Sequence, residues 1–204
     1  RYTVAMPSRD LADITLEPGG ASYGSLTVAT TGTITGALKL TDGSSATFSG
    51  RVSRSGEWSL HRSLYGATGG YFAGKLTFRD VDDVSDMDGQ MRWVKPNAVP
   101  RTTTYPGGFG VTRTLIGSRF TPPAKGSRAL ALADTLYNAW LRLDGPDMSN
   151  QPALDLPSVD RAVTWSTANK ITYYGPDKAT VTFSATTGLA TGSYTDTARG
   201  VSIR

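Results

Sequence analysis

The densest group of side chains able to do chemistry is an acidic segment, Arg79–Gly89, with the sequence RDVDDVSDMDG. Carboxylate oxygens are the ligands that Ca²⁺ prefers, so Asp82, Asp86 and Asp88 are the candidate metal ligands. The bidentate glutamate that closes an EF-hand loop is missing downstream, and a solvated acidic hairpin loop explains the same residues. Calcium is therefore the one cofactor that the sequence suggests, and that suggestion is an expectation to be tested.

Residues typical of acid–base or nucleophilic catalysis are few. The chain has 0 Cys and 1 His (His61), which excludes thiol nucleophiles, thiolate-ligated metals and any site within one chain that needs two imidazoles. A Gly-x-Ser-x-Gly string surrounds Ser22, but Pro18 and two glycines precede it where a nucleophile elbow needs a strand, so we expect a glycine turn. The glutamates Glu17 and Glu57 each lie in turn-like sequence. These observations predict a protein that is not an enzyme.

Aromatic side chains offer a second kind of chemistry, since a ring presents an apolar face that matches the C–H face of a pyranose sugar. The chain has 4 Trp and 9 Tyr. Three of the tryptophans lie within alternating strands and are expected to fill the core. Tyr65, Tyr71 and Tyr105 lie close to glycines and are the candidates for exposed rings that bind a polysaccharide.

Composition narrows the class of protein. A chain of 204 residues can bury a large core without disulfides. The net charge of +4 invites a nucleic-acid partner, but the basic residues are scattered singly along the chain, so none is expected. No apolar run approaches the roughly 18 residues of a membrane helix. The 23 Gly, with few Glu and Lys, favour short strands joined by tight turns.

An internal repeat gives the clearest structural signal. The stretch TVATTGTITGALKLTDG, from Thr27, is echoed by TFSATTGLATGSYTDT, from Thr182. Each copy predicts a β-hairpin, in which the first glycine takes positive φ in a short loop. The second glycine, four residues later, is expected to mark a bulge or a place where a bulky side chain crosses the strand. The glycines expected to shape such turns and strands are Gly32, Gly36, Gly74, Gly89, Gly188 and Gly192.

Alternating apolar residues predict an all-β fold built from antiparallel hairpins, either a sandwich or a partly closed barrel. The expected strands are Tyr2–Met6, Ser25–Ala29, Ala46–Val52, Trp58–His61, Gln90–Val94, Gly110–Ile116, Ala139–Leu143, Val163–Ser166, Ile171–Tyr174 and Ala179–Ser184. The segment Arg128–Leu143 also fits a helical period, but its paired leucines alternate, and strands are favoured there.

The chain is expected to form one β-rich unit over 1–204. A proline- and glycine-rich seam at 121–127 separates two sub-regions, 1–120 and 128–204. Further loops are expected at 97–108 and 145–157, which are also rich in proline and glycine.

The ordered motifs resemble a known kind of domain. They are YTVAMP, YGSLTVATTGTITGALKLTDGSSATFSG, SRSGEWSLHRSLYGATGGYFAGKLTF, MDGQMRWVKP, YPGGFG, IGSRFTPP and TTGLATGSYTD. Together they look like a β-rich domain of large secreted multidomain proteins of environmental Gram-negative bacteria. The resemblance covers essentially the whole chain and implies an extracellular all-β domain with no established enzymatic activity. In such domains a further Phe-x-Gly strand usually follows, whereas this chain has GVSIR, so two alternatives stay open: the last strand is complete in this chain, or a neighbouring chain supplies it.

These features favour a non-catalytic structural or adhesive module of a secreted or cell-surface bacterial protein, present as a mature or excised piece. Its partners would be other domains or copies of the same surface protein. One alternative is a carbohydrate-binding module, with or without calcium. The other is a subunit of a filament or array that is joined by strand addition.

Overall fold

The chain folds almost entirely as β-strands. A computed structural model describes residues 1–9, 15–97, 99–100, 104–143, 159–176, 178–196 and 201–203. Apart from one short 3-10 helix, η1 (Gly66–Thr68), the regular elements in these residues are antiparallel strands, which confirms the predicted all-β class. The chain divides into two compact units, Arg1–Phe120 and Thr121–Arg204, and the division falls at the beginning of the expected seam. The loop expected at 145–157 lies outside the described residues.

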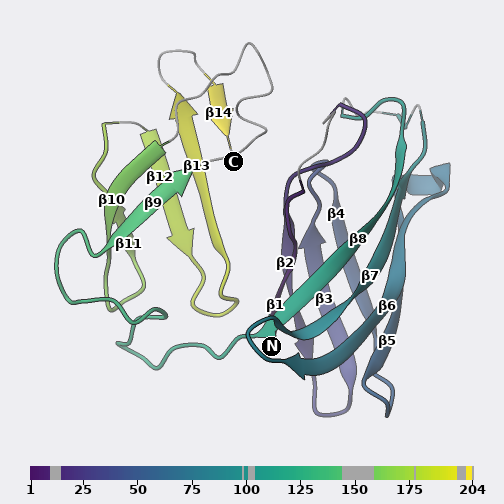
Figure 1. Ribbon diagram of the computed structural model, residues 1–204, viewed down its shortest axis with the longest axis horizontal. Coiled ribbons are helices and arrows are strands. Elements are labelled where there is room, and N and C mark those ends of the chain that lie inside the picture. Colours follow the sequence, from purple (N-terminus) through teal and green to yellow (C-terminus); the bar gives the residue numbers. More distant parts are fainter. Residues whose placement is uncertain are drawn as a thin grey trace. The chain divides into compact units, whose positions relative to one another are not determined.

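The first unit is one antiparallel sheet of eight strands in the order β4-β3-β2-β1-β8-β7-β6-β5 (Figure 1). Its strands are β1 (Tyr2–Met6), β2 (Ser22–Val28), β3 (Thr33–Lys39), β4 (Ser45–Arg51), β5 (Glu57–Leu64), β6 (Gly70–Val81), β7 (Ser85–Lys95) and β8 (Phe109–Arg119). The sheet curls until its two edge strands, β4 and β5, contact each other, so the unit is a nearly closed barrel. The partly closed barrel expected from the sequence is thus the architecture of this unit.

Alternation along each strand fills the interior of the barrel. In β7, for example, Met87, Met91 and Trp93 point inward and are buried, while Gln90 and Arg92 between them are exposed. The same pattern in the other strands builds one core. Its largest fully buried apolar side chains are Val4, Met6, Leu26, Ile34, Leu38, Phe72, Leu76, Met87, Met91, Trp93 and Leu115.

Side chains close the barrel between β4 and β5. The rings of Phe48 on β4 and Trp58 on β5 lie 5.4 Å apart between centroids. Trp58 also lies against Gly50 of β4, where an added Cβ would come within 2.4 Å of the indole Nε1. The aromatic packing therefore depends on a residue without a side chain at position 50.

The connection between β1 and β2 is tied to the barrel by a buried arginine. Arg113 of β8 is buried, in phase with its inward-pointing neighbours Val111 and Leu115. Its guanidinium donates hydrogen bonds to the carbonyl of Pro18, at 2.7 Å, and to that of Pro7, at 2.5 Å. Desolvation lowers the pKa of this guanidinium. Through these two hydrogen bonds Arg113 holds both ends of the β1–β2 connection.

The repeated glycines occupy hairpin turns and crowded strand positions. Gly32, between β2 and β3, has a φ of 79°, and Gly188, in the second copy of the repeat, has a φ of 74°. Gly36 lies inside β3, where an added Cβ would come within 2.6 Å of the Phe48 ring, and at Gly192 it would come within 2.4 Å of a backbone oxygen of the paired strand. The first glycine of each copy thus adopts the positive φ that the turn requires, and the second lies where no space is left for a Cβ atom.

The second unit contains two small antiparallel sheets. One has the order β11-β10-β9 and the other β12-β13-β14 (Figure 1). The strands are β9 (Ala139–Leu143), β10 (Val159–Trp165), β11 (Ile171–Tyr173), β12 (Lys178–Phe183), β13 (Ala190–Asp196) and β14 (Val201–Ile203). The rings of Trp165 on β10 and Phe183 on β12 lie 4.9 Å apart between centroids and join the two sheets.

The segment ahead of β9 is neither helix nor strand, so the strand preference for 128–143 is wrong before residue 139. Hydrogen bonds between side chains and the backbone replace strand pairing in this segment. The buried Arg128 guanidinium donates to the carbonyls of Leu132 and Ala133. The Asn169 side chain accepts a hydrogen bond from the Ala129 amide at 2.8 Å. The Asn138 amide donates to the carbonyl of Ala133. Polar side chains that bond the backbone compete with regular structure in this way.

The crowded strand glycines predict a matched pair of stability effects. At Gly74 in β6 an added Cβ would come within 2.1 Å of the backbone oxygen of Gln90, whereas at Gly107 nothing lies within 4 Å. We expect Gly74→Ala to lower the free energy of unfolding by about 1–3 kcal/mol, because a strand backbone cannot move away cheaply. Gly107→Ala should change it by less than about 0.5 kcal/mol. Denaturant unfolding followed by tryptophan fluorescence measures both, and equal effects would contradict this account of the glycines.

Candidate functional site

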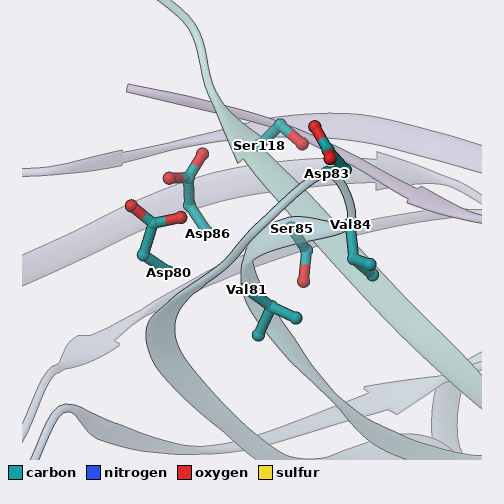
Figure 2. A pocket seen from close by; sticks show the side chains of 7 residues that line it. All are labelled: Asp80, Val81, Asp83, Val84, Ser85, Asp86 and Ser118. Carbon is teal, nitrogen blue, oxygen red and sulfur yellow. The ribbon is translucent and has the colours of Figure 1, made fainter.

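The acidic segment forms the hairpin between β6 and β7. Val81 pairs with Ser85 across a turn in which Asp83 adopts a φ of 58°. A pocket of about 210 Å³ opens beside this turn. Figure 2 shows the side chains that line it, which are Asp80, Val81, Asp83, Val84, Ser85, Asp86 and Ser118.

The structure separates the three predicted calcium ligands. Asp88 is held by a bidentate ion pair with Arg79, with contacts of 2.7 and 2.8 Å. Asp86 accepts a hydrogen bond from the backbone amide of Arg119 at 2.5 Å. Asp82 is exposed in the turn and does not line the pocket. Within the described residues no three acidic or histidine side chains are grouped closely enough to hold a metal ion.

Ser85 contributes nothing to a cation site at this pocket. Its hydroxyl is buried and lacks a hydrogen-bond partner. In Figure 2 it points away from the carboxylates of Asp80 and Asp86, as strand alternation requires for adjacent residues. The carboxylates at the pocket are those of Asp80, Asp83 and Asp86, and calcium stays a prediction from the sequence.

A second pocket, of about 260 Å³, adjoins the first and shares Asp80 and Asp86 with it. Its aromatic wall consists of Tyr2 and Phe78, whose rings meet edge to face at 5.4 Å. Arg119 also lines it, so charges of both signs face this space. Mixed charge of this kind is ordinary at the solvated end of a barrel and does not by itself indicate a ligand site.

Tyr65 belongs to a polar network near one end of the barrel. Its hydroxyl donates a 2.6 Å hydrogen bond to the Asp42 carboxylate and accepts one of 2.9 Å from the Trp93 indole. Asp42 also accepts bonds from the amide and the hydroxyl of Ser44. The ammonium of the buried Lys95 lies 5.7 Å from the centre of the Tyr65 ring. Burial and the Asp42 carboxylate together raise the pKa of Tyr65 well above its ordinary value.

The other two candidate sugar-binding tyrosines lie apart. Tyr105 is half-buried and packs edge to face on Phe109 at 5.4 Å, and Phe109 in turn packs on Trp93 at 4.8 Å. The structure therefore brings Tyr105 close to the Tyr65 network. Tyr71 lies on the outer face of β6, where its ring stacks on that of His61 at 5.9 Å. The three tyrosines do not share one surface.

The residues considered for catalysis are held in separate contacts. Ser22 begins β2 and is buried, with its hydroxyl 2.9 Å from that of Thr41, so the expected glycine turn at this position is wrong. Glu17 pairs with Arg9 at 3.0 Å. Glu57 pairs with Lys75 at 2.7 Å, and this lysine lowers the pKa of the Glu57 carboxyl. Each glutamate is therefore held in an ion pair with a basic side chain.

The second unit exposes aromatic residues that the sequence did not single out. Trp140 on β9 is 70% exposed, Tyr137 is 56% exposed and Tyr174 is 46% exposed. Of the tryptophans, Trp58 and Trp93 are buried in the barrel and Trp165 is half-buried in the second unit. Sequence alternation is the same for Trp140 and Trp165 and cannot say which of the two faces solvent.

Comparisons with known proteins identify no relative. No protein-family model, curated protein or solved structure matches the chain. Among the described residues, no helix is long and apolar enough to cross a membrane.

The Tyr65 network predicts that the free energy of unfolding decreases at alkaline pH. Because the pKa of Tyr65 is raised in the folded state, its stabilising effect is complete below the ordinary tyrosine pKa of about 10 and is lost as pH rises above it. Tyr65→Phe should lower the free energy of unfolding at pH 7 by about 1–3 kcal/mol, since the buried Trp93 indole and the half-buried Asp42 carboxylate each lose a hydrogen bond. The variant should also lose less stability between pH 9 and pH 11 than the wild type does. Parallel pH curves for the two proteins would contradict the role of the phenol, and Tyr23→Phe, on an exposed ring, is the control.

Proposed function

We propose that the protein is a non-catalytic structural or adhesive module of a secreted or cell-surface bacterial protein. The observation that carries the proposal is the set of large apolar side chains on the second unit that face solvent. They are Leu130, Leu136, Tyr137, Trp140 and Tyr174. The rings of Tyr137 and Tyr174 are in contact with each other. Exposed apolar side chains that form a contiguous patch mark a site of interaction.

The barrel supports this proposal as a rigid scaffold. Its interior is filled by side chains, and its edge strands are joined by Phe48 and Trp58. The large apolar side chains that it exposes, Leu16, Tyr23 and Val84, lie in different elements. Scattered exposed apolar residues of this kind are ordinary on a protein surface and need no partner.

The residues able to do acid–base chemistry support a non-catalytic role. Glu17 and Glu57 are each neutralised by a basic side chain, and His61 stacks on Tyr71 on the outer face of the barrel. A general acid or base has to reach the proton that it transfers and needs a pKa suited to the pH. These three side chains lie in separate contacts.

Adhesion tests the proposal directly. Beads coated with the chain should bind to bacterial cells and to cell-envelope material, and Leu136→Asp should weaken the binding because it places a charge among exposed apolar side chains. The matched control is Leu16→Asp, which changes an equally exposed leucine of the barrel. Adding either CaCl₂ or a chelator shows whether calcium assists. Binding no stronger than that of albumin-coated beads would rule out an adhesive role.

Oligomeric state separates the adhesive module from a subunit joined by strand addition. In the second unit, β9 and β14 lie at outer edges of the two sheets, whereas the barrel edges face each other. An added strand would have to pair with an exposed edge. We expect a monomer by light scattering over a hundredfold range of concentration, roughly from micromolar upward. Growth into polymers over this range would favour strand addition.

A further inference from the structure

The exposed aromatic rings of the second unit lie on one face of its first sheet. In register, Trp140 of β9 lies opposite Ala162 of β10, and Val163 lies opposite Tyr173. Tyr174 is the residue after the end of β11, and side-chain alternation directs it to the face opposite to Tyr173, which is the face that carries Trp140. Val163, on the other face, is only 4% exposed, so the aromatic face is the outer one.

The third ring is held in place by its backbone. Tyr137 adopts a φ of 56°, which is uncommon for a residue with a side chain. Its amide donates a 3.0 Å hydrogen bond to the hydroxyl of Thr164 on β10. Its ring meets that of Tyr174 edge to face, with centroids 5.0 Å apart. Asn138, the next residue, is bonded to the backbone of Trp165 through both ends of its side-chain amide. The position of Tyr137 is therefore fixed before any ligand arrives.

The space between the rings is lined by small and neutral groups. Ala162 and Thr164 of the central strand belong to the same face as Trp140. Adjacent strands lie about 4.8 Å apart, so aromatic residues on the two outer strands are separated by roughly 10 Å. Arg142 and Asp160 face each other in register beside them and balance in charge. Among the described residues of β9 and β10, the face therefore combines an aromatic ring with a hydroxyl group, and its one arginine is balanced by one aspartate.

These properties favour a neutral sugar polymer over other partners. An anionic lipid surface or a nucleic acid would be matched by clustered basic residues, and here one arginine faces one aspartate. A pyranose offers an apolar C–H face to a ring and hydroxyl groups to threonine and to charged side chains. We propose that Trp140, Tyr137 and Tyr174 form a binding face for a neutral polysaccharide. The proposal rests on the adhesive function and names its ligand.

The binding face is tested with the whole chain and four kinds of probe. Affinity gel electrophoresis in gels containing β-glucan, xylan, mannan or dextran measures retardation by neutral polymers. Alginate serves as the charged polymer and phosphatidylcholine vesicles as the lipid surface. Trp140→Ala and Tyr174→Ala remove one ring each. Tyr23→Ala is the matched control, because Tyr23 is a similarly exposed ring on β2 of the barrel. The fourth probe is adhesion of coated beads to cells treated with periodate, which destroys vicinal diols of sugars.

We expect at least one neutral polysaccharide to retard the wild type and Tyr23→Ala alike. Trp140→Ala should bind it about tenfold more weakly, as expected from loss of a stacked ring, while its melting temperature matches that of the wild type because the ring is exposed. Retardation by none of the neutral polymers, or equal retardation of wild type and Trp140→Ala, would overturn the proposal. If beads still adhere to periodate-treated cells or to lipid vesicles, the adhesive function stands and the sugar ligand fails. If beads adhere to nothing, both fail.

Discussion

The barrel depends on closing an eight-stranded sheet where its two edge strands meet. A closed barrel leaves no free strand edge, but β4 and β5 stand at opposite ends of the strand order and are joined through side chains instead. Phe48 and Trp58 supply that contact, and Gly50 provides the room for the indole. The rings of Phe48 and Trp58 therefore serve to close the barrel.

Two polar clusters complement the closure by aromatic packing. Arg113 ties the β1–β2 connection to the barrel through the carbonyls of Pro7 and Pro18. Tyr65 joins Asp42, in the turn after β3, to Trp93 on β7. A buried polar group stabilises a fold only when its partners are in place, so both clusters also specify how these loops must lie.

The sequence predicts the all-β class and the turns at Gly32 and Gly188, because period-two alternation and positive φ are local properties. The expected strands do not include β6, and the preference for strands ahead of β9 is wrong. It does not distinguish Trp140 from Trp165, since solvent exposure depends on which sheet face meets Phe183, a contact between distant segments. It also assigned Tyr65 to the surface from the neighbouring glycine, although Asp42 and Trp93 hold its hydroxyl. The acidic segment suggested three ligands together, but Arg79 neutralises Asp88, and this pairing follows from the β6–β7 register.

The two units use their aromatic residues differently. In the barrel, Trp58 and Trp93 are buried by closure and by the core, so their faces are not available to a ligand. In the second unit, two three-stranded sheets have less interior to fill, and they meet through the Trp165–Phe183 contact and between β11 and β12. The rings of Trp140, Tyr137 and Tyr174 are not needed to fill this interior and are exposed at the surface. An exposed tryptophan held in a strand brings a rigid apolar surface to a ligand with little loss of side-chain entropy, which is why recognition is better placed here than on the barrel.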